Sequence, residues 1–222
     1  MAWLLYKKPG VGRRLKWIPI DEAQDGLADD SLIKRWYWYE QNITQPANTV
    51  APTITGNPWV GSVLTANEGT WTGGSLTYTY QWKADGVDVA GATGKTRTLQ
   101  AAQAGKAMTV VVTATNLVGN ASQQSAATAA VIAAPTNTAV PTISGTAQVG
   151  QTLTAANGTW TGSPAFTRQW KANGTNISGA TATTYIPVVG DVGKTITVTV
   201  TGTNAAGNAS ATSAATAAVI AA

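Results

Sequence analysis

Side chains able to perform acid–base or metal chemistry are scarce in this sequence. Its 222 residues include ten acids but no histidine and no cysteine, which excludes a thiolate nucleophile, a histidine base, a disulfide and an ordinary zinc site. Beyond residue 46 the only acids are Glu68, Asp85, Asp88 and Asp191. Paired-carboxylate catalysis needs two acids on facing elements, and nothing in their spacing indicates such a pair. We therefore expect a protein that is not an enzyme and holds no cofactor and no metal.

Two segments that resemble ligand-binding loops depart from the spacing those loops need. Lys8-Pro-Gly-Val-Gly-Arg13 has glycines among basic residues but lacks the Lys-Ser/Thr that completes a phosphate-binding P-loop. The segment from Asp21 has Ala23 at the third position and Leu32 at the twelfth, where a calcium loop needs oxygen ligands. We interpret the first as a plain turn and predict no calcium site in the second.

Tryptophan supplies the remaining candidates for ligand contact, because flat aromatic rings near loops can stack on sugars. We expect Trp59, Trp71 and Trp160 to be exposed to solvent. Trp71 and Trp160 lie in identical Gly-Thr-Trp-Thr-Gly motifs, which favours packing of these rings over the end of a domain. Trp59 has no tryptophan counterpart elsewhere in the chain, so it is the better candidate for a glycan contact.

The charge of +4 is unevenly distributed. Residues 1–20 carry five basic residues and no acid, whereas residues 21–30 carry five acids and no base. Beyond residue 46 only 11 charges are spread over 176 residues, too few for the clustered basic face of a nucleic-acid-binding protein. No apolar run reaches the roughly 18 residues that span a bilayer, and the first residues lack the pattern of a secretory signal. We expect a soluble protein that does not insert into membranes, bind nucleic acid or use the ordinary export route.

The greater part of the chain is a tandem duplication. Gly69-Thr-Trp-Thr-Gly73 recurs as Gly158-Thr-Trp-Thr-Gly162. Residues 83–134 and 171–222 align without a gap, and 29 of these 52 positions are identical. We call residues 47–134 repeat one and residues 135–222 repeat two.

Each repeat reads as a series of short strands. Residues 107–113 and 195–201 alternate with period two, which predicts strands with one apolar face. Residues 76–82 likewise place Tyr78, Tyr80 and Trp82 on one side, and Asp85-Gly86 and Asn173-Gly174 are typical of hairpin turns. The apolar residues of the two alternating segments are Met108, Val110, Val112, Ile196, Val198 and Val200. Short strands separated by glycine and asparagine favour a β-sandwich.

A resemblance to a known family rests on motifs that both repeats share. Trp82-Lys-Ala-Asp-Gly86 matches Trp170-Lys-Ala-Asn-Gly174, Gly91-Ala-Thr93 matches Gly179-Ala-Thr181, and an Asn-x-x-Gly follows the long strand in each repeat; repeat two also has Asp191-Val-Gly-Lys194 before that strand. With these motifs each repeat resembles the immunoglobulin-like domains of bacterial surface proteins and phage virions. The resemblance implies an all-β chain of two tandem immunoglobulin-like sandwiches, at 47–134 and 135–222, behind an N-terminal segment at 1–46.

The resemblance also implies which residues form the core, and it has two departures. Trp82 and Trp170 would be core tryptophans of the third strand, without the disulfide of antibody domains. Repeat one has Gln103 where repeat two has Asp191, and repeat two has Arg168 where repeat one has Tyr80. The full set of expected core residues is Trp82, Trp170, Val110, Val112, Val198 and Val200.

Residues 1–46 have no second copy and contain seven of the sixteen aromatic residues and thirteen of the 24 charged ones. So short a segment, lacking disulfides and metal, buries too little surface to be stable by itself. Its secondary structure is open: residues 30–39 could form a helix, or residues 36–39 a strand. We expect a docking segment rather than a separate subdomain. Its candidate docking residues are Trp3, Tyr6, Arg13, Arg14, Trp17, Trp36, Tyr37, Trp38 and Tyr39.

Together, these features favour a phage virion protein, assembled in the host cytoplasm and carried on the surface of the particle. We expect residues 1–46 to bind a capsid or tail subunit, with two sandwiches projecting outward as a head decoration or head fibre. Many copies on one particle, or a homo-oligomer there, would strengthen weak contacts with host-surface glycans. The alternatives are a tail decoration or fibre component, a bacterial surface adhesin and a carbohydrate-binding module.

Overall fold

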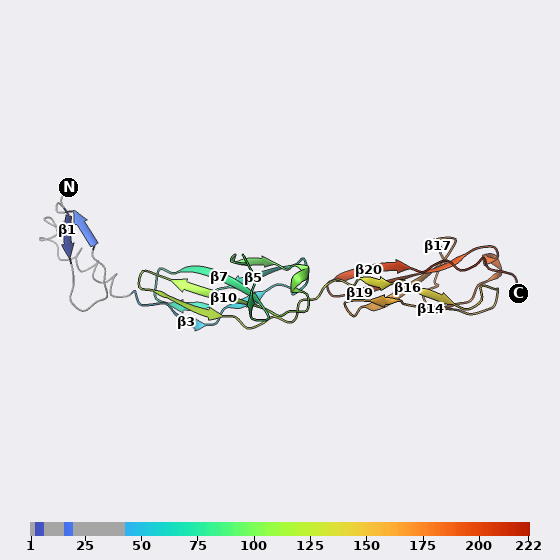
Figure 1. The fold of residues 1–222 in the computed structure, drawn as a ribbon, viewed down its shortest axis with the longest axis horizontal. Coiled ribbons are helices and arrows are strands. Elements are labelled where there is room, and N and C mark those ends of the chain that lie inside the picture. The colour runs from blue at the N-terminus through green and yellow to red at the C-terminus, as the bar shows by residue number, and fades with distance from the viewer. Residues whose placement is uncertain (1–2, 7–15, 20–42) are drawn as a thin grey trace. The chain divides into compact units, whose positions relative to one another are not determined.

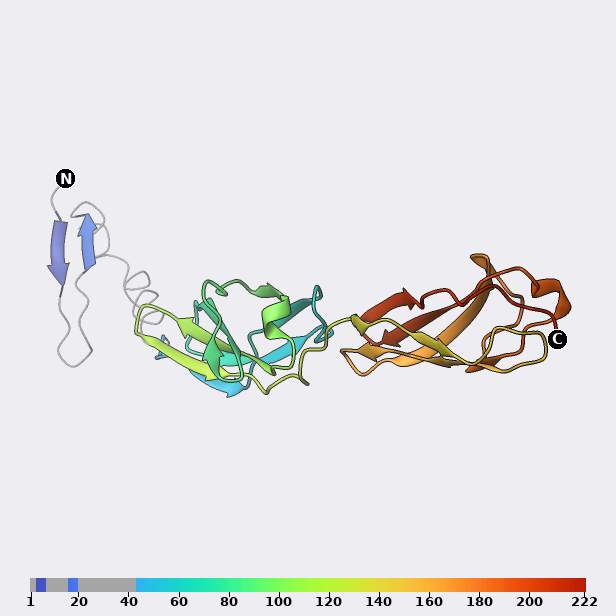
Figure 2. The same cartoon turned by 45° about the vertical axis from the view of Figure 1, so that its right-hand side comes forward.

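The computed structural model describes residues 3–6, 16–19 and 43–222. These residues are almost entirely β structure, with one short N-terminal hairpin and two tandem sets of strands (Figures 1 and 2). The hairpin consists of β1 (Trp3–Tyr6) and β2 (Lys16–Pro19), which pair antiparallel. The chain divides into two compact units. One contains the described residues up to 51 together with residues 68–79 and 112–123, and the other contains residues 52–67, 80–111 and 124–222. This division crosses repeat one, so the domain limits at 47–134 and 135–222 stay a prediction.

Repeat one forms two groups of antiparallel strands. The first group contains the pair β3–β6 and the three-stranded order β4-β5-β9, and the second is the four-stranded order β11-β10-β7-β8. The strands are β3 (Ala47–Val50), β4 (Thr53–Thr55), β5 (Val63–Asn67), β6 (Thr70–Thr72), β7 (Thr77–Ala84), β8 (Val87–Asp88), β9 (Thr96–Thr98), β10 (Met108–Thr115) and β11 (Asn120–Gln124). A 3₁₀ turn, η1 (Ala101–Gln103), connects β9 toward β10.

Repeat two repeats this arrangement strand for strand. Its sheets have the orders β12-β15, β13-β14-β18 and β17-β16-β19-β20. The strands are β12 (Asn137–Ala139), β13 (Thr142–Ser144), β14 (Leu153–Ala156), β15 (Thr159–Trp160), β16 (Ala165–Ala172), β17 (Thr175–Asn176), β18 (Thr184–Tyr185), β19 (Ile196–Asn204) and β20 (Gly207–Thr212), with η2 (Val189–Asp191) before β19. In both repeats, two sheets of short strands face one four-stranded sheet. This arrangement is the immunoglobulin-like β-sandwich.

The alternating segments form the central strands, as their pattern predicts. In β10 and β19 every second residue is fully buried, because successive side chains of a strand point to opposite faces. The fully buried residues include Trp82, Trp170, Val110, Val112, Val198 and Val200. In repeat two, Leu153, Trp170 and Ile196 belong to one cluster, against which Phe166 and Tyr185 pack.

Each core tryptophan needs a partner for its indole N–H, because a buried unpaired donor destabilises a fold. Trp82 Nε1 donates to the Gly94 carbonyl at 2.9 Å, and Trp170 Nε1 donates to the Ala182 carbonyl at the same distance. These bonds tie the central strand of one sheet to the chain that leads into β9 or β18. The tryptophans therefore fix the two layers of each sandwich as well as filling its core.

The predicted turns after β7 and β16 are two-residue hairpins. Asp85 and Gly86 have φ values of 47° and 81°, and Asn173 and Gly174 have 47° and 80°. Positive φ at both central positions is the type I′ turn, whose twist matches that of the flanking strands and which Asn, Asp and Gly tolerate best. These residues therefore set the register of β8 and β17.

Glycine is required where β5 bends into β6. Gly69 has a φ of 77°, and a Cβ atom there would lie 2.1 Å from the Val50 carbonyl oxygen. Gly158 repeats this geometry, with a φ of 75° and the same 2.1 Å approach to the Ala139 carbonyl oxygen. No side chain fits so close to backbone, so this glycine positions the tryptophan that follows it two residues later.

Candidate functional site

The N-terminal hairpin carries three of the candidate docking residues. Trp3 and Tyr6 form the ends of β1, and Trp17 lies in β2 opposite Leu5. Within the described part of the chain, β1 and β2 pair only with each other. An isolated two-stranded hairpin is marginally stable in water and has two unpaired backbone edges. Arg13, Arg14, Trp36, Tyr37, Trp38 and Tyr39 lie outside the described residues, as do the helix and strand alternatives for 30–39.

Trp71 and Trp160 are not the solvent-exposed rings that we expected. Both are partly buried. Trp71 packs on Tyr78 with ring centroids 6.5 Å apart, and Trp160 packs edge-on against Phe166 at 5.8 Å. Each indole N–H is also bonded, at 2.7 Å, to the backbone carbonyl three residues earlier. Both rings therefore pack against their own repeat, as the shared Gly-Thr-Trp-Thr-Gly motif predicts, and only the expectation that they are exposed to solvent was wrong.

Trp59 is also partly buried, against the same expectation. It forms a parallel bridge with Ile132, and the backbone around it is bonded to that strand through Val60 N–H to the Ile132 carbonyl at 2.9 Å. Gln148 occupies the equivalent position of repeat two and bridges Ile220 in the same way. The position therefore serves strand pairing in both repeats, and a glycan contact at Trp59 stays a prediction.

Titratable side chains meet at one point in repeat two. The Tyr185 hydroxyl donates to Asp191 Oδ2 at 2.5 Å, and the Val188 N–H donates to the same oxygen at 3.0 Å. Burial, followed by the hydrogen bond and the negative charge of Asp191, raises the pKa of Tyr185 well above its usual range. A neutral tyrosine that donates to a buried carboxylate stabilises the turn η2 and offers no base to a substrate. This is a structural contact.

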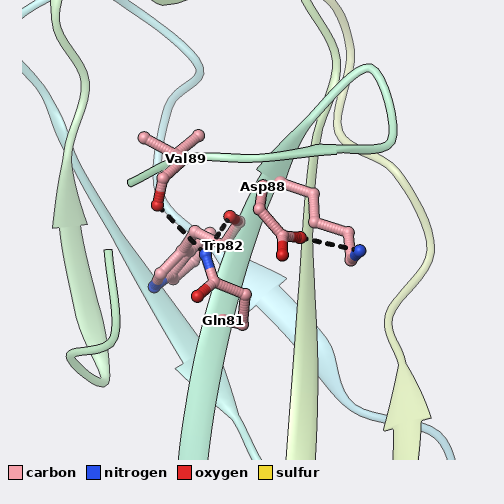
Figure 3. Close-up of polar contacts among 5 residues, drawn as sticks. Gln81, Trp82, Asp88 and Val89 are labelled. Carbon is pink, nitrogen blue, oxygen red and sulfur yellow. Dashed lines mark hydrogen bonds and ion pairs between the residues drawn. The ribbon is translucent and has the colours of Figure 1, made fainter. Parts of the chain in front are cut away.

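The remaining described residues offer no group of three or more acids that could hold a metal ion. They also include no helix long and apolar enough to cross a membrane. Lys83 Nζ lies 2.7 Å from Asp88 Oδ1 across the β7–β8 hairpin, beside the Gln81 amide that donates to the carbonyls of Trp82 and Val89 (Figure 3). These polar contacts join neighbouring strands of one sandwich.

Our sequence analysis missed a group of exposed apolar residues at one end of repeat two. Residues 186–192 and 218–220 meet there, because Val192 is bridged to Val219. The neighbouring residues Val149 and Gly150 also donate their N–H groups to the carbonyls of Ile220 and Pro187. We call this end the C-terminal pole; it holds the C-terminus of the chain (Figure 1). Its exposed apolar side chains are Ile186, Val188, Val189, Val192 and Ile220. Comparing the repeats position by position would have revealed it.

Comparison with known proteins identifies no family for this chain. No family model and no curated protein match the chain. A three-domain I-band fragment of titin is 18% identical over 79% of this chain, with a TM-score of 0.41. An Antarctic bacterial adhesin described as binding ice is 15% identical over 79%, with a TM-score of 0.46, and the first four Dscam1 domains are 17% identical over 81%, with a TM-score of 0.31. The chain spans 65%, 50% and 48% of the lengths of these three proteins. The likeness concerns the tandem immunoglobulin-like fold alone.

Proposed function

We propose that this chain is a non-enzymatic structural protein of a bacteriophage particle. In this proposal residues 1–46 dock on a capsid or tail subunit, and the two sandwiches project outward as a decoration or head fibre. The chain acts at the virion surface after assembly in the host cytoplasm, where many copies contact the host surface weakly and together bind it firmly. A tail decoration or fibre component has the same architecture and differs only in the subunit that residues 1–46 bind.

The observation that carries the proposal is the isolated hairpin β1–β2. Its eight residues include the aromatic residues Trp3, Tyr6 and Trp17 and the aliphatic residues Leu4, Leu5 and Ile18. In the described part of the chain this hairpin is paired with no other strand. Burying each aromatic side chain contributes about 1.5–3 kcal/mol, which a hairpin by itself cannot realise. A partner surface supplies that burial, and strand addition at a free edge supplies backbone hydrogen bonds.

The two sandwiches support a structural role by what their residues do. Their core tryptophans, turn residues and polar pairs are each engaged within their own repeat. Trp71 and Trp160 are partly buried and each packs on an aromatic neighbour, which favours a structural role over a paired aromatic platform for carbohydrate binding. Of the glycan candidates, only Trp59 keeps that role within the proposal.

Deletion of residues 1–46 tests the docking role. We expect residues 47–222 to fold as a soluble monomer that no longer assembles into particles, with lower stability because the bonds from Asn116 to Thr44 and from Gln45 to Asn120 are lost. Gradient-purified particles would be probed for the full chain and for the truncated chain expressed beside it, with Trp59→Ala in the full chain as a control that still assembles. Truncated protein that sediments with particles at the level of the full chain would overturn the proposal.

Proline substitutions in β1 test the mode of docking. Consecutive N–H groups of a strand point to opposite sides, and proline has no N–H. Of the two variants Leu4→Pro and Leu5→Pro, one therefore removes a hydrogen bond between β1 and β2, and the other removes a donor at the outer edge of β1. We expect both to reduce particle incorporation if a subunit adds a strand to this edge. Loss with one proline and full incorporation with the other would show that the edge is not used.

A further inference from the structure

We infer that the C-terminal pole of repeat two docks on a lipid bilayer that carries anionic headgroups. This is a peripheral contact by a loop tip, distinct from a membrane span. It adds a contact site to the proposed projecting sandwiches and does not depend on how residues 1–46 dock. The inference rests on two independent differences between repeats that share one fold.

The first difference is that repeat two has apolar residues on a short exposed segment where repeat one has polar or small residues. Residues 98–104 of repeat one and 186–192 of repeat two differ at all seven positions, although both are followed by Gly-Lys and 29 of the 52 aligned positions are identical. Five of these positions are exposed in both repeats, and at four of them repeat two has a large aliphatic residue. Thr98, Gln100, Ala101 and Ala104 of repeat one correspond to Ile186, Val188, Val189 and Val192 of repeat two. Because these sites are exposed in both sandwiches, the fold does not require the apolar side chains.

The chain segments that carry these side chains meet at the pole. The Val189 side chain belongs to η2 and is 78% exposed, and Val192 follows that turn immediately. Val192 is bridged to Val219, the neighbour of Ile220. A tip that exposes four or five aliphatic side chains together is unlike the scattered apolar residues of an ordinary surface, and it marks an interaction site.

The second difference is the loss of negative charge from repeat two. Its one side-chain acid is Asp191, which is 5% exposed and bonded to Tyr185. All three acids of repeat one, Glu68, Asp85 and Asp88, are replaced by asparagine in repeat two, at 157, 173 and 176. The exposed surface of repeat two therefore has no side-chain carboxylate.

Two of these replacements lie beside the pole. Asn173 is bonded to Thr195, and the preceding Lys194 is bonded through its backbone to both Asp191 and Val219. Lys171 pairs in register with Asn176, whereas Lys83 of repeat one lies 2.7 Å from the carboxylate of Asp88. Lys194 therefore lies beside the apolar tip, and Lys171, on the strand whose hairpin turn includes Asn173, lacks the carboxylate that pairs with its counterpart Lys83; we call these two lysines the positive rim.

An apolar tip with a positive rim fits an anionic bilayer better than a second copy of this chain. Two such poles brought together would place like charges against each other at the rim. Headgroups attract the lysines, and the acyl boundary accepts protruding aliphatic side chains without a preformed pocket. Both features of the pole are then used.

The test compares the full chain with a variant in which repeat two carries the pole of repeat one: Ile186→Thr, Val188→Gln, Val189→Ala and Val192→Ala. Repeat one forms the same turn with these residues, so the variant should fold, as circular dichroism would check. Flotation with vesicles of phosphatidylcholine plus phosphatidylglycerol should show binding of the full chain, and the variant should partition at least about ten-fold more weakly. Both proteins keep residues 1–46, so any binding through that segment cancels.

The charge is tested with Asn173→Asp and Asn176→Asp, which restore the acids of repeat one. Each should weaken vesicle binding about five-fold, and added salt should weaken binding of the unmodified chain. The reciprocal change in repeat one, with Thr98→Ile, Gln100→Val, Ala101→Val and Ala104→Val, should increase binding.

Three results would overturn the inference. One is failure of the full chain to float with phosphatidylglycerol vesicles, and another is equal flotation of the four-residue variant. The third is self-association in sedimentation velocity that the same variant abolishes while no vesicle binding occurs, which would assign the pole to a second copy. Particle incorporation is measured separately, so failure of either proposal leaves the other to be judged by its own result.

Discussion

Repeat one and repeat two use different side chains to make the same hydrogen bonds. Asp85 and Asn173 each accept a backbone N–H 22 residues later, at 2.8 and 2.9 Å. Gln103 and Asp191 each accept the N–H three residues earlier, at 2.8 and 3.0 Å. At these positions the sandwich requires an acceptor oxygen in the right place, and a negative charge is not needed. Charge and apolar character on the surface were therefore free to diverge between the repeats.

The largest effects are expected where the repeats are identical. Trp82→Ala and Trp170→Ala should each lower the free energy of unfolding of their own sandwich by about 3–5 kcal/mol, because each leaves a core cavity. Urea unfolding followed by circular dichroism measures this for both variants. Trp82→Phe and Trp170→Phe are the matched controls, which keep most of the volume but lose the indole hydrogen bond. If either alanine variant unfolds at the same urea concentration as the parent, the equivalence of the two cores is wrong.

The next largest effect concerns an asparagine that closes the end of each sandwich. Asn116 Nδ2 donates to the carbonyls of Thr44 and Gly73, at 2.7 and 2.8 Å. Asn204 Nδ2 of repeat two donates to the carbonyl of Ala133, near the end of repeat one, at 2.8 Å, and to the Gly162 carbonyl at 3.0 Å. Asn116→Ala and Asn204→Ala should each reduce stability by about 1–3 kcal/mol, because the carbonyls lose their donor. Thermal unfolding checks this, with the exposed Asn208→Ala as a control that should change little.

The repeats should differ in their response to alkaline pH. Tyrosines of the unfolded chain lose their hydroxyl proton near pH 10. Because the pKa of Tyr185 is raised in the fold, folded repeat two keeps the Tyr185 hydroxyl proton at a pH where the unfolded chain has lost it. Repeat two should therefore become less stable as the pH rises above about 10. Unfolding of the parent and of Tyr185→Phe across this range should show the stability advantage of the parent shrinking. Tyr78→Phe in repeat one is the control, and an advantage that stays constant with pH would contradict the prediction.

The smallest effect sharpens the comparison directly. Asp85→Asn gives repeat one the residue that repeat two has at the same turn, so its stability should change by less than about 0.5 kcal/mol. Asp85→Ala should cost about 1 kcal/mol, because the Ala107 N–H loses its acceptor and the left-handed turn loses a residue that tolerates it. Differential scanning calorimetry of the two variants separates these outcomes. A large loss with asparagine would show that the charge itself matters in repeat one.

Much of the fold was predictable because local patterns and global packing agree. The alternation in 107–113 and 195–201 identified β10 and β19, and Asp85-Gly86 and Asn173-Gly174 identified the hairpins. The duplication strengthened each of these predictions, since a pattern that survives in two diverged copies is one that the fold uses.

The accessibility of the tryptophans was not predictable in the same way. The shared motif favours packing of Trp71 and Trp160, but the sequence does not show which residues cover them. Their partial burial depends on the bends at Gly69 and Gly158 and on Tyr78 or Phe166 in the following strand, whereas Trp59 is bridged to Ile132. The C-terminal pole was missed for a related reason, because the exposure of Val188 and Val189 follows from their place on a turn and not from their chemistry.

The sequence by itself determined the number of repeats, their strands and turns, the residues of their cores and the absence of cysteine and histidine chemistry. These follow from periodicity and residue type, which act over a few neighbouring positions. Tertiary structure decided which tryptophans are covered, where Asp191 finds its tyrosine and which apolar residues gather at one pole. Those outcomes depend on contacts between distant segments, because burial is set by what packs against a side chain rather than by the side chain itself.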